Sequence, residues 1–302
     1  MDPSAPGPED DEAPVGAAPT HRHRRRWRLV ALAAVVVVLG AAAVIVVPYF
    51  FRAHPGAVAV KSVVRGFKSG GASGAHGVAY VPPAQGVYTL KGSGMERINF
   101  PPNSQQDGAT MPASVTYDGD GCWRWRVDYN IAHWETYLFC PKSTRMLERS
   151  EANSQTWDFG TVKVANLAQF ACTANAVVLP TDPATHQTLR WSCTGGNSAI
   201  SGRTVQRVTV HLLGEGNLKV GAATVRAVHE EQDVTLSGVQ RGTVAEDWWL
   251  SLASGLPLRM ERRITILSSS PVGTVTYTES GSWRMASVHP QTSAPAKHAK
   301  GK

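Results

Sequence analysis

Residues 205–213 read Val-Gln-Arg-Val-Thr-Val-His-Leu-Leu, and this stretch decides the fold class. Apolar side chains stand at Val208, Val210 and Leu212, with one polar residue between each neighbouring pair. A period of two places successive side chains on opposite faces, which is typical of a β-strand with one buried face. The stretch therefore predicts a strand in a sheet that covers a core.

The same alternation recurs on both sides of this stretch. It is present at 225–228, 234–237, 264–266 and 275–277. Glycine, asparagine, aspartate and proline interrupt it at intervals of roughly 8–12 residues, a spacing typical of antiparallel hairpins. We therefore expect the chain after residue 78 to be mainly β and antiparallel.

One segment, Val164–Val178, has a helical pattern instead. Leu167, Phe170, Ala171 and Ala174 follow the i, i+3, i+4, i+7 spacing of an amphipathic helix with one apolar face. The sequence therefore predicts a helix here.

Near the N-terminus, a basic cluster precedes a long apolar run. Five arginines lie within 22–28, and residues 29–51 are 23 positions without a charged side chain. A bilayer core about 30 Å thick needs roughly 20 helical residues, so the run is long enough to span it. The apolar region of a secretory signal peptide is shorter, about 7–15 residues, so an uncleaved anchor is favoured. Because arginines stay on the cytoplasmic side, the N-terminus is predicted to be cytoplasmic.

These features divide the chain into five segments. Residues 1–28 are predicted to be a disordered cytoplasmic tail with the basic flank, and 29–51 a transmembrane helix. Residues 52–77 are rich in glycine, alanine and serine and are predicted to be a flexible stalk. An extracytoplasmic β domain at 78–287 and a second disordered tail at 288–302 follow. The predicted location is the cell membrane, crossed once.

The net charge of +7 is distributed unevenly. The arginines before the apolar run have a topological role, and three lysines lie in the tail 288–302. Between residues 52 and 287 there are 22 basic and 18 acidic residues, which is too even a balance for a nucleic-acid footprint. We therefore expect no nucleic-acid partner, and we expect the membrane, with a lipid or an envelope protein, as the partner.

All cysteines follow the apolar run: Cys122, Cys140, Cys172 and Cys193. An extracytoplasmic compartment permits disulfides, and four cysteines allow three pairings. Cys122 and Cys140 flank a predicted hairpin, and Cys172 and Cys193 flank a turn at 181–184. The sequence therefore favours Cys122–Cys140 and Cys172–Cys193. A metal site is not predicted, because the chain has no C-x-x-C pair.

A stretch further along resembles a known family. Residues 247–250 (Asp-Trp-Trp-Leu), followed by 254–259 (Ser-Gly-Leu-Pro-Leu-Arg), resemble the signature turn of LolA-like proteins, a group that includes the lipoprotein carrier LolA and the RseB sensor domain. Residues 88–96 resemble the first strand of their meander. The resemblance implies a long curled antiparallel sheet, half-barrel-like, with one or two helices and a hollow for acyl chains. The anchored architecture also resembles single-pass envelope proteins of high-GC bacteria.

Four tryptophans are the candidate ligand contacts. Trp123 and Trp125 share one face of a strand, and packing in the core is favoured for them over lining a pocket. Trp248 and Trp249 point to opposite faces, so one is expected in the core and the other exposed or in the hollow. The second pair is therefore the stronger candidate.

Two acidic groups, at 230–233 and 246–247, are interpreted as charged residues on a solvated strand or turn. Residues 118–121 (Asp-Gly-Asp-Gly) lack the third ligand of a calcium loop, because Cys122 occupies that position, and they are interpreted as a turn.

No catalytic signature is present, whether H-E-x-x-H, G-x-S-x-G, a Walker loop or a dinucleotide fingerprint. We therefore expect no enzymatic activity and no cofactor. The leading hypothesis is a membrane-anchored extracytoplasmic protein that binds a lipid, a lipoprotein or another hydrophobic envelope ligand. The alternative is a structural or sensing subunit whose outer domain docks onto another membrane protein.

Overall fold

A computed structural model describes residues 55–69, 81–183, 186–270 and 273–291. The chain divides into two units, 1–51 and 52–302, and the described residues all belong to the second. The predicted cytoplasmic tail and transmembrane helix lie outside the described residues. Within the described residues, no helix combines the length and apolar character that a membrane crossing requires.

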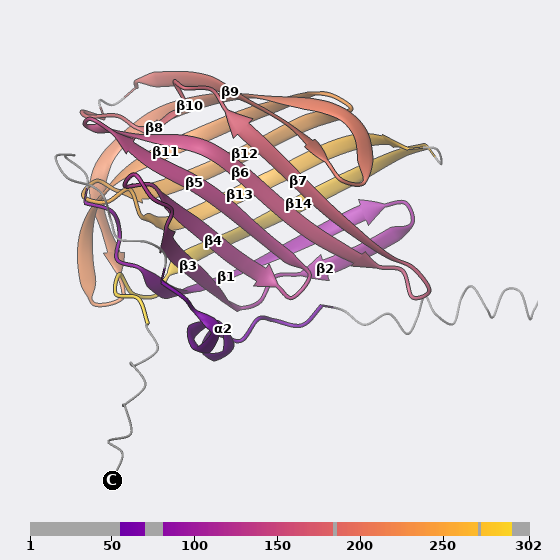
Figure 1. Cartoon of the computed structure of the whole chain (residues 1–302), viewed down its shortest axis with the longest axis horizontal. Coiled ribbons are helices and arrows are strands. Elements are labelled where there is room, and N and C mark those ends of the chain that lie inside the picture. The colour runs from indigo at the N-terminus through magenta and orange to yellow at the C-terminus, as the bar shows by residue number, and fades with distance from the viewer. Residues whose placement is uncertain (1–54, 70–80, 184–185, 271–272, 292–302) are drawn as a thin grey trace, which may run out of the picture. The chain divides into compact units, whose positions relative to one another are not determined.

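The second unit is built from one antiparallel sheet of 14 strands (Figure 1). Neighbouring strands follow the order β14-β13-β12-β11-β10-β9-β7-β6-β5-β4-β3-β1-β2, and β8 pairs with β6. The strands are β1 (Gly86–Asn99), β2 (Pro102–Gln106), β3 (Thr110–Tyr117), β4 (Trp123–Asn130), β5 (His133–Lys142), β6 (Arg145–Asp158), β7 (Lys163–Cys172), β8 (Val177–Leu179), β9 (Thr188–Asn197), β10 (Ile200–Val220), β11 (Ala223–Gly238), β12 (Gln240–Ser251), β13 (Pro257–Ser270) and β14 (Gly273–Met285). The prediction of a mainly β, antiparallel domain is confirmed.

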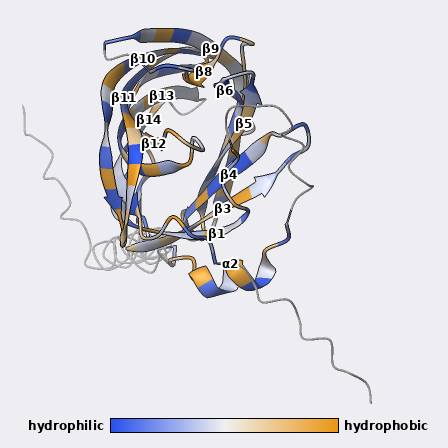
Figure 2. Ribbon diagram, turned by 90° about the vertical axis from the view of Figure 1, so that its left-hand side faces the viewer, coloured by the Kyte–Doolittle hydropathy of each residue, from blue (hydrophilic) through white to orange (hydrophobic). Residues whose placement is uncertain are grey.

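The sheet closes on itself. β14 pairs with β1 over nine successive positions, from Leu90 opposite Met285 to Ile98 opposite Tyr277. Figure 2 shows the strands following one another around a closed ring. The half-barrel expected from the LolA-like resemblance is therefore wrong, and the sheet is a closed antiparallel barrel. Closure pairs the backbone groups that an open sheet would leave unpaired at its edges.

The helix predicted at Val164–Val178 is also wrong. Residues 163–172 form strand β7, which pairs with β6 on one side and with β9 on the other. Val164, Asn166, Ala168 and Phe170 face the barrel interior, so the relevant period is two and not 3.6. The alanines give the segment a helical preference, but pairing on both sides outweighs a local propensity of this size.

Several local predictions are confirmed. Residues 122–129 and 135–140 lie in the β4–β5 hairpin, and 247–250 precede the turn that leads into β13.

One short helix, α2 (Val60–Gly66), lies within the segment predicted to be a stalk and contacts β1 and β3. The backbone carbonyl of Gly56 in this segment also accepts a hydrogen bond of 2.9 Å from the N–H of Ile131.

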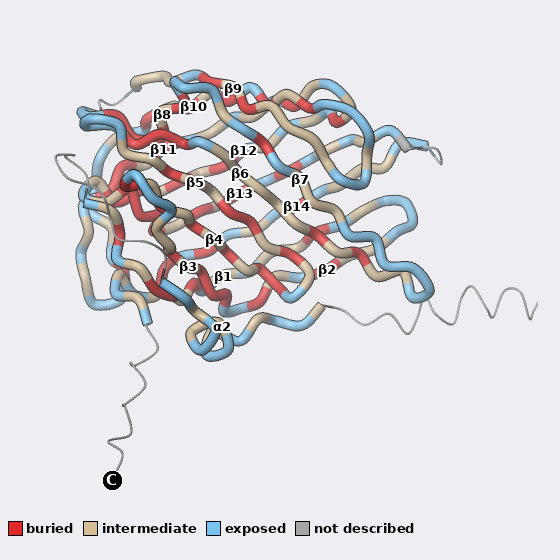
Figure 3. Tube along the Cα trace, in the orientation of Figure 1, coloured by how far each residue is buried: buried red, intermediate tan, exposed pale blue. Residues whose placement is uncertain are grey.

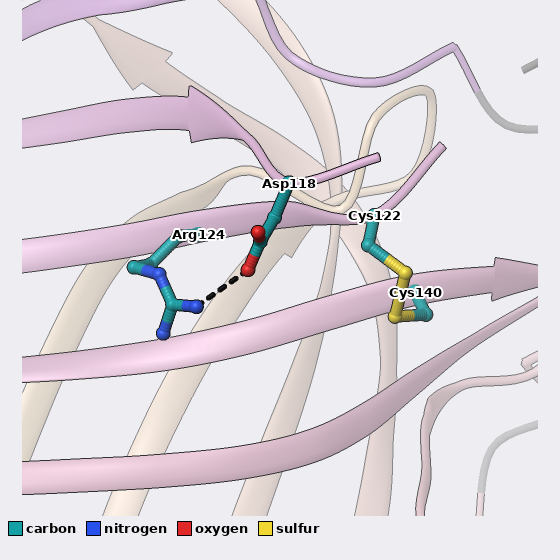
Figure 4. Close-up of a disulfide and its surroundings, with 4 residues drawn as sticks. All are labelled: Asp118, Cys122, Arg124 and Cys140. Atoms are coloured by element: carbon teal, nitrogen blue, oxygen red, sulfur yellow. Dashed lines mark hydrogen bonds and ion pairs between the residues drawn. A yellow bond between two sulfur atoms is a disulfide. The ribbon is translucent and has the colours of Figure 1, made fainter. Parts of the chain in front are cut away.

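Both disulfides join the cysteines that the turn positions favour. Cys122 is bonded to Cys140 across β4 and β5, next to an ion pair between Arg124 and Asp118 (Figure 4). Cys172 is bonded to Cys193, its direct partner in the β7–β9 register. Each bridge therefore ties together two neighbouring parts of the ring.

One end of the barrel is filled by a core of large side chains, which we call the packed end. Trp125 is fully buried there, and its ring lies 6.0 Å from that of Tyr88 and 6.1 Å from that of Trp283. Trp123 and Leu258 are buried in the same cluster. Figure 3 shows buried and intermediate residues alternating along strands that supply this core, such as β4.

Residues 52–302 contain what a domain needs to fold independently. The ring of strands closes within this unit, both disulfides form within it, and the core cluster comes from its own strands. A compact unit with its own core is the physical definition of an independently folding domain.

Candidate functional site

The rest of the barrel interior is a cavity of about 410 Å³, which we call the hollow. This volume lies within the range of roughly 300–1,000 Å³ found for small-molecule sites. Its mouth lies where β1, β7 and β14 reach their hairpins, and Phe100 and Val164 line it while remaining partly exposed. Below the mouth the exposed wall is mainly apolar, with lining residues that include Leu236, Val244, Ile264, Ile266 and Val275, and it also carries polar side chains such as those of Asn166 and Gln206.

The four candidate tryptophans are placed in three different environments. Trp123 and Trp125 belong to the packed end and do not line the hollow. Trp248 is buried and lines the hollow. Trp249 faces outward, where its ring stacks on His229 at 4.1 Å between centroids and lies under the Arg259 guanidinium. Of the four, only Trp248 can contact a ligand inside the barrel.

A belt of polar side chains crosses the barrel interior close to the packed end, and Trp248 and Leu250, on the packed-end side of it, still line the hollow. On β13, Arg262 stands between Met260 of the core and Ile264 of the hollow. On β12, Glu246 stands between Trp248 and Val244. The polar belt consists of Glu96, His133, Glu135, Glu148, Glu151, Asn153, Gln155, Glu230, Glu246, Arg262 and Glu279.

One part of the polar belt, which we call the paired network, is centred on Arg262. Its side chain is 1% exposed, and its Nη1 donates a hydrogen bond of 2.6 Å to Oε2 of Glu135. The same guanidinium forms an ion pair with Glu279 and lies 4.3 Å above the ring centroid of Tyr129. A buried guanidinium needs such partners, because an isolated charge in the barrel interior would be very costly.

His133 extends the paired network to β1. Its Nδ1 lies 2.7 Å from Oε1 of Glu96, and both side chains are fully buried. Asn153 donates to Oε1 of Glu135 at 2.8 Å, and Gln155 donates to Oε2 of Glu96 at 3.1 Å. The paired network therefore consists of Glu96, His133, Glu135, Asn153, Gln155, Arg262 and Glu279.

The protonation states of this network follow from burial and charge. Burial by itself would lower the pKa of His133, but Glu96 and Glu135 raise that pKa well above its usual value, so the imidazole is protonated. Burial would raise the pKa of Glu135, but the charges of Arg262 and His133 hold it well below its usual range. Two cations thus balance most of the negative charge in this part of the belt.

The other part of the polar belt is four glutamates, which we call the acidic set: Glu148, Glu151, Glu230 and Glu246. Glu230 is 0% exposed, and Glu148 and Glu246 are also buried. The interpretation of 230–233 and 246–247 as solvated surface charges is therefore wrong for Glu230 and Glu246. It is correct for Glu231, which is exposed on the opposite face of β11.

A bulge in β6 completes the acidic set. The β5–β6 register pairs Leu138 with Ser150 but Phe139 with Glu148, so Arg149 is the extra residue. An extra residue shifts the alternation of a strand by one position. Glu148 and Glu151 therefore both line the hollow, although their spacing of three would place them on opposite faces of a regular strand.

Burial changes the acidity of this set. It raises the pKa of Glu230 to about 8 and that of Glu246 to about 7. It also raises the pKa of Glu151 to about 7, against the opposing effect of a hydrogen bond from Gln206. The pKa of Glu148 is raised well above its usual value by burial and by the charges of the other three. Near neutral pH the acidic set is therefore partly protonated.

Sequence reasoning missed the polar belt, although a signal for it was present. On β11 the inward positions fixed by Val228, Val234 and Leu236 include Glu230. On β12 the inward positions include Glu246 next to Trp248. The signal that could have identified the polar belt is a charged residue at a position that the alternation of apolar residues places on the inner face of a strand.

The described residues include two groups with a metal-like arrangement of ligands. Glu148 lies near Cys172 and Cys193, but those sulfurs are bonded to each other and are not thiolates. Glu96, Asp107 and His133 form the second group, in which the imidazole is already bonded to Glu96. Residues 118–121 form a turn in which the N–H of Asp118 donates to the carbonyl of Cys122 at 2.9 Å, as predicted.

Fold and site together define a closed antiparallel barrel with a polar belt beneath an apolar hollow. Comparison of the chain with protein-family models, with curated proteins and with solved structures found no match in any of the three.

Proposed function

We propose that this protein is a non-enzymatic, membrane-anchored extracytoplasmic binding protein that holds a hydrophobic ligand in the hollow of its barrel. The observation that carries the proposal is the cavity of about 410 Å³, with mainly apolar walls and a mouth lined by partly exposed apolar residues. Each methylene group that leaves water for such a wall contributes about 0.8 kcal/mol.

The location predicted from the sequence agrees with the same proposal. Both disulfides call for an oxidising compartment, and the arginines at 22–28 before an apolar run orient the barrel towards the outside. A barrel tethered there has lipids and lipoproteins as its nearest apolar molecules. The LolA-like resemblance of 247–259 agrees with this class of ligand.

The experiment uses residues 52–302 and the neutral apolar probe diphenylhexatriene, whose fluorescence rises in an apolar site. We expect saturable binding with one probe per barrel. Ala168→Trp, which places an indole in the hollow from β7, should weaken binding at least tenfold. Gln169→Trp is the matched control, because Gln169 is exposed on the outer face of the same strand.

Two results would contradict the proposal. The first is a wild-type barrel that gives no saturable rise in fluorescence while its near-ultraviolet circular dichroism shows a folded core. The second is equal binding by Ala168→Trp and Gln169→Trp, because the probe would then bind somewhere other than the hollow.

A further inference from the structure

The ionisable side chains that line the hollow are all acidic. Its described lining residues include no lysine, arginine or histidine, but they include six glutamates: Glu135, Glu148, Glu151, Glu230, Glu246 and Glu279. Glu135 and Glu279 are ion-paired with Arg262, which lies behind the wall. The remaining four are the acidic set, and no ion pair joins any of them to a described cation.

Neutral donors satisfy only part of the acidic set. Gln232 donates to Oε1 of Glu230 at 2.7 Å, and the indole N–H of Trp248 donates to Oε2 of Glu246 at 2.8 Å. Within the described chain, Oε2 of Glu230 and Oε1 of Glu148 have no hydrogen-bond partner, although both are buried. A buried acceptor without a partner costs on the order of 1–3 kcal/mol, so both atoms favour a donor supplied from the hollow.

The acidic set also has a fixed depth. On β11, Glu230 lies deeper than Val234 and Leu236, and on β12, Glu246 lies deeper than Val244. Glu230 is the register partner of Trp248, which places Glu230 and Glu246 diagonally across neighbouring strands. A ligand that fits this order has a polar group at its inner end and an apolar body towards the mouth.

We propose that the hollow takes a cationic amphiphile, whose protonated amine enters first and lies against Glu148, Glu230 and Glu246 while its apolar chain extends towards the mouth. This inference rests on the proposed function and specifies its ligand class. An ammonium offers three donors and a positive charge, which match both the unpartnered oxygens and the excess of carboxylates. Trp248 and Tyr137, whose ring centroids lie 5.7 Å apart in an edge-to-face pair, line the hollow beside these carboxyls and offer an aromatic contact to the ammonium.

The inference predicts a pH dependence of binding. Because the pKa of Glu230 is about 8 and that of Glu246 about 7, the empty hollow gains carboxylate charge as the pH rises from 5 to 8. Glu148 and Glu151 face these two from β6, and their raised pKa values act in the same direction. Of the charged groups on β13 and β5, Arg262 lowers the pKa of Glu246 and Glu135 raises it, and both effects are smaller than that of burial. An alkylamine remains protonated across this range, so its affinity should increase with pH.

The test measures displacement of diphenylhexatriene from residues 52–302 by dodecylamine, dodecanol and dodecanoate, each below its micelle concentration. At pH 8 we expect dodecylamine to displace the probe at a concentration at least tenfold lower than dodecanol, with dodecanoate weakest. Glu230→Gln should reduce the preference for amine over alcohol at least threefold. Glu231→Gln, on the exposed face of the same strand, should leave it unchanged.

The outcomes separate the two proposals. If the probe binds but amine and alcohol displace it equally, or dodecanoate is strongest, the amine inference is overturned and the proposed function stands. An amine preference that survives Glu230→Gln and Glu148→Gln together also overturns it, because the amine would then bind outside the acidic set. If the probe itself does not bind, the proposed function fails first.

Discussion

The two parts of the polar belt solve the same physical problem in opposite ways. Both place carboxyl groups in the barrel interior, at the boundary between a filled core and a hollow. In the paired network, Arg262 and protonated His133 lie within hydrogen-bond distance of Glu135 and Glu96. In the acidic set, only amide and indole groups donate, and burial raises the pKa values of the carboxyls. Burial also raises the pKa of Glu279 in the paired network, to about 8, although the charge of Arg262 opposes this.

This difference indicates which part is structural and which is available to a ligand. A charge pair that is complete within the protein has no further need of a partner, and removing one member leaves the other uncompensated. A cluster of carboxyls that remains partly protonated can release protons and bind a cation in their place. We therefore expect the paired network to hold the barrel together, and we propose the acidic set as the part that a ligand contacts.

The largest expected effect breaks the paired network. Arg262→Met removes the cation from between Glu135 and Glu279 and leaves two buried carboxyls without it. We expect the free energy of unfolding at pH 7 to fall by about 4 kcal/mol. Urea denaturation followed by tryptophan fluorescence measures this loss. Arg263→Met is the matched control because Arg263 is exposed, and it should change stability by less than about 0.5 kcal/mol.

A smaller effect of opposite sign is expected in the acidic set. The pKa of Glu230 is about 8 in the folded protein, against an ordinary value of 4.5. Below pH 4.5 both folded and unfolded states are protonated. As the pH rises towards 8, the unfolded chain loses this proton more readily, so the wild-type protein loses stability across that window.

Glu230→Gln removes this loss. Relative to wild type, the variant should be slightly more stable at pH 5, and this advantage should grow by about 3 kcal/mol between pH 5 and pH 8. Urea denaturation at the two pH values measures the difference, with Glu231→Gln as the control that shows no such divergence. A Glu230→Gln variant that is less stable than wild type at pH 8 would contradict the placement of Glu230 in an uncompensated set.

The smallest effect sharpens the comparison within the acidic set. Gln232→Met removes the donor to Glu230 while keeping a side chain of similar length. We expect a loss of about 1 kcal/mol at pH 8 and a further rise in the pKa of Glu230, because that hydrogen bond stabilises its charged form. Carboxyl carbon resonances followed by NMR during a pH titration measure the rise. Thr235→Met, exposed on the same strand, should leave both quantities unchanged.

Much of the local structure could be predicted from alternation and turn residues. The β4–β5 hairpin, the turn before β13 and both disulfides are in the expected places, because each depends on residues about 20 positions apart or fewer. Burial of Trp123 and Trp125 follows from the same alternation. The site was harder to predict. Charged residues at inward-facing positions of a strand indicate a polar interior only when the barrel is known to enclose a hollow.

The sequence by itself determined the strands with clear alternation, such as 205–213, and the cysteine pairs, because side-chain alternation and turn chemistry act over short distances. Only the tertiary structure decided closure, because that requires Leu90 and Met285 to meet across almost the whole domain. It also converted residues 163–172 from a predicted helix to a strand, because β6 and β9 pair with them from both sides. The bulge at Arg149 then brought Glu148 and Glu151 to one wall, which no local period could show.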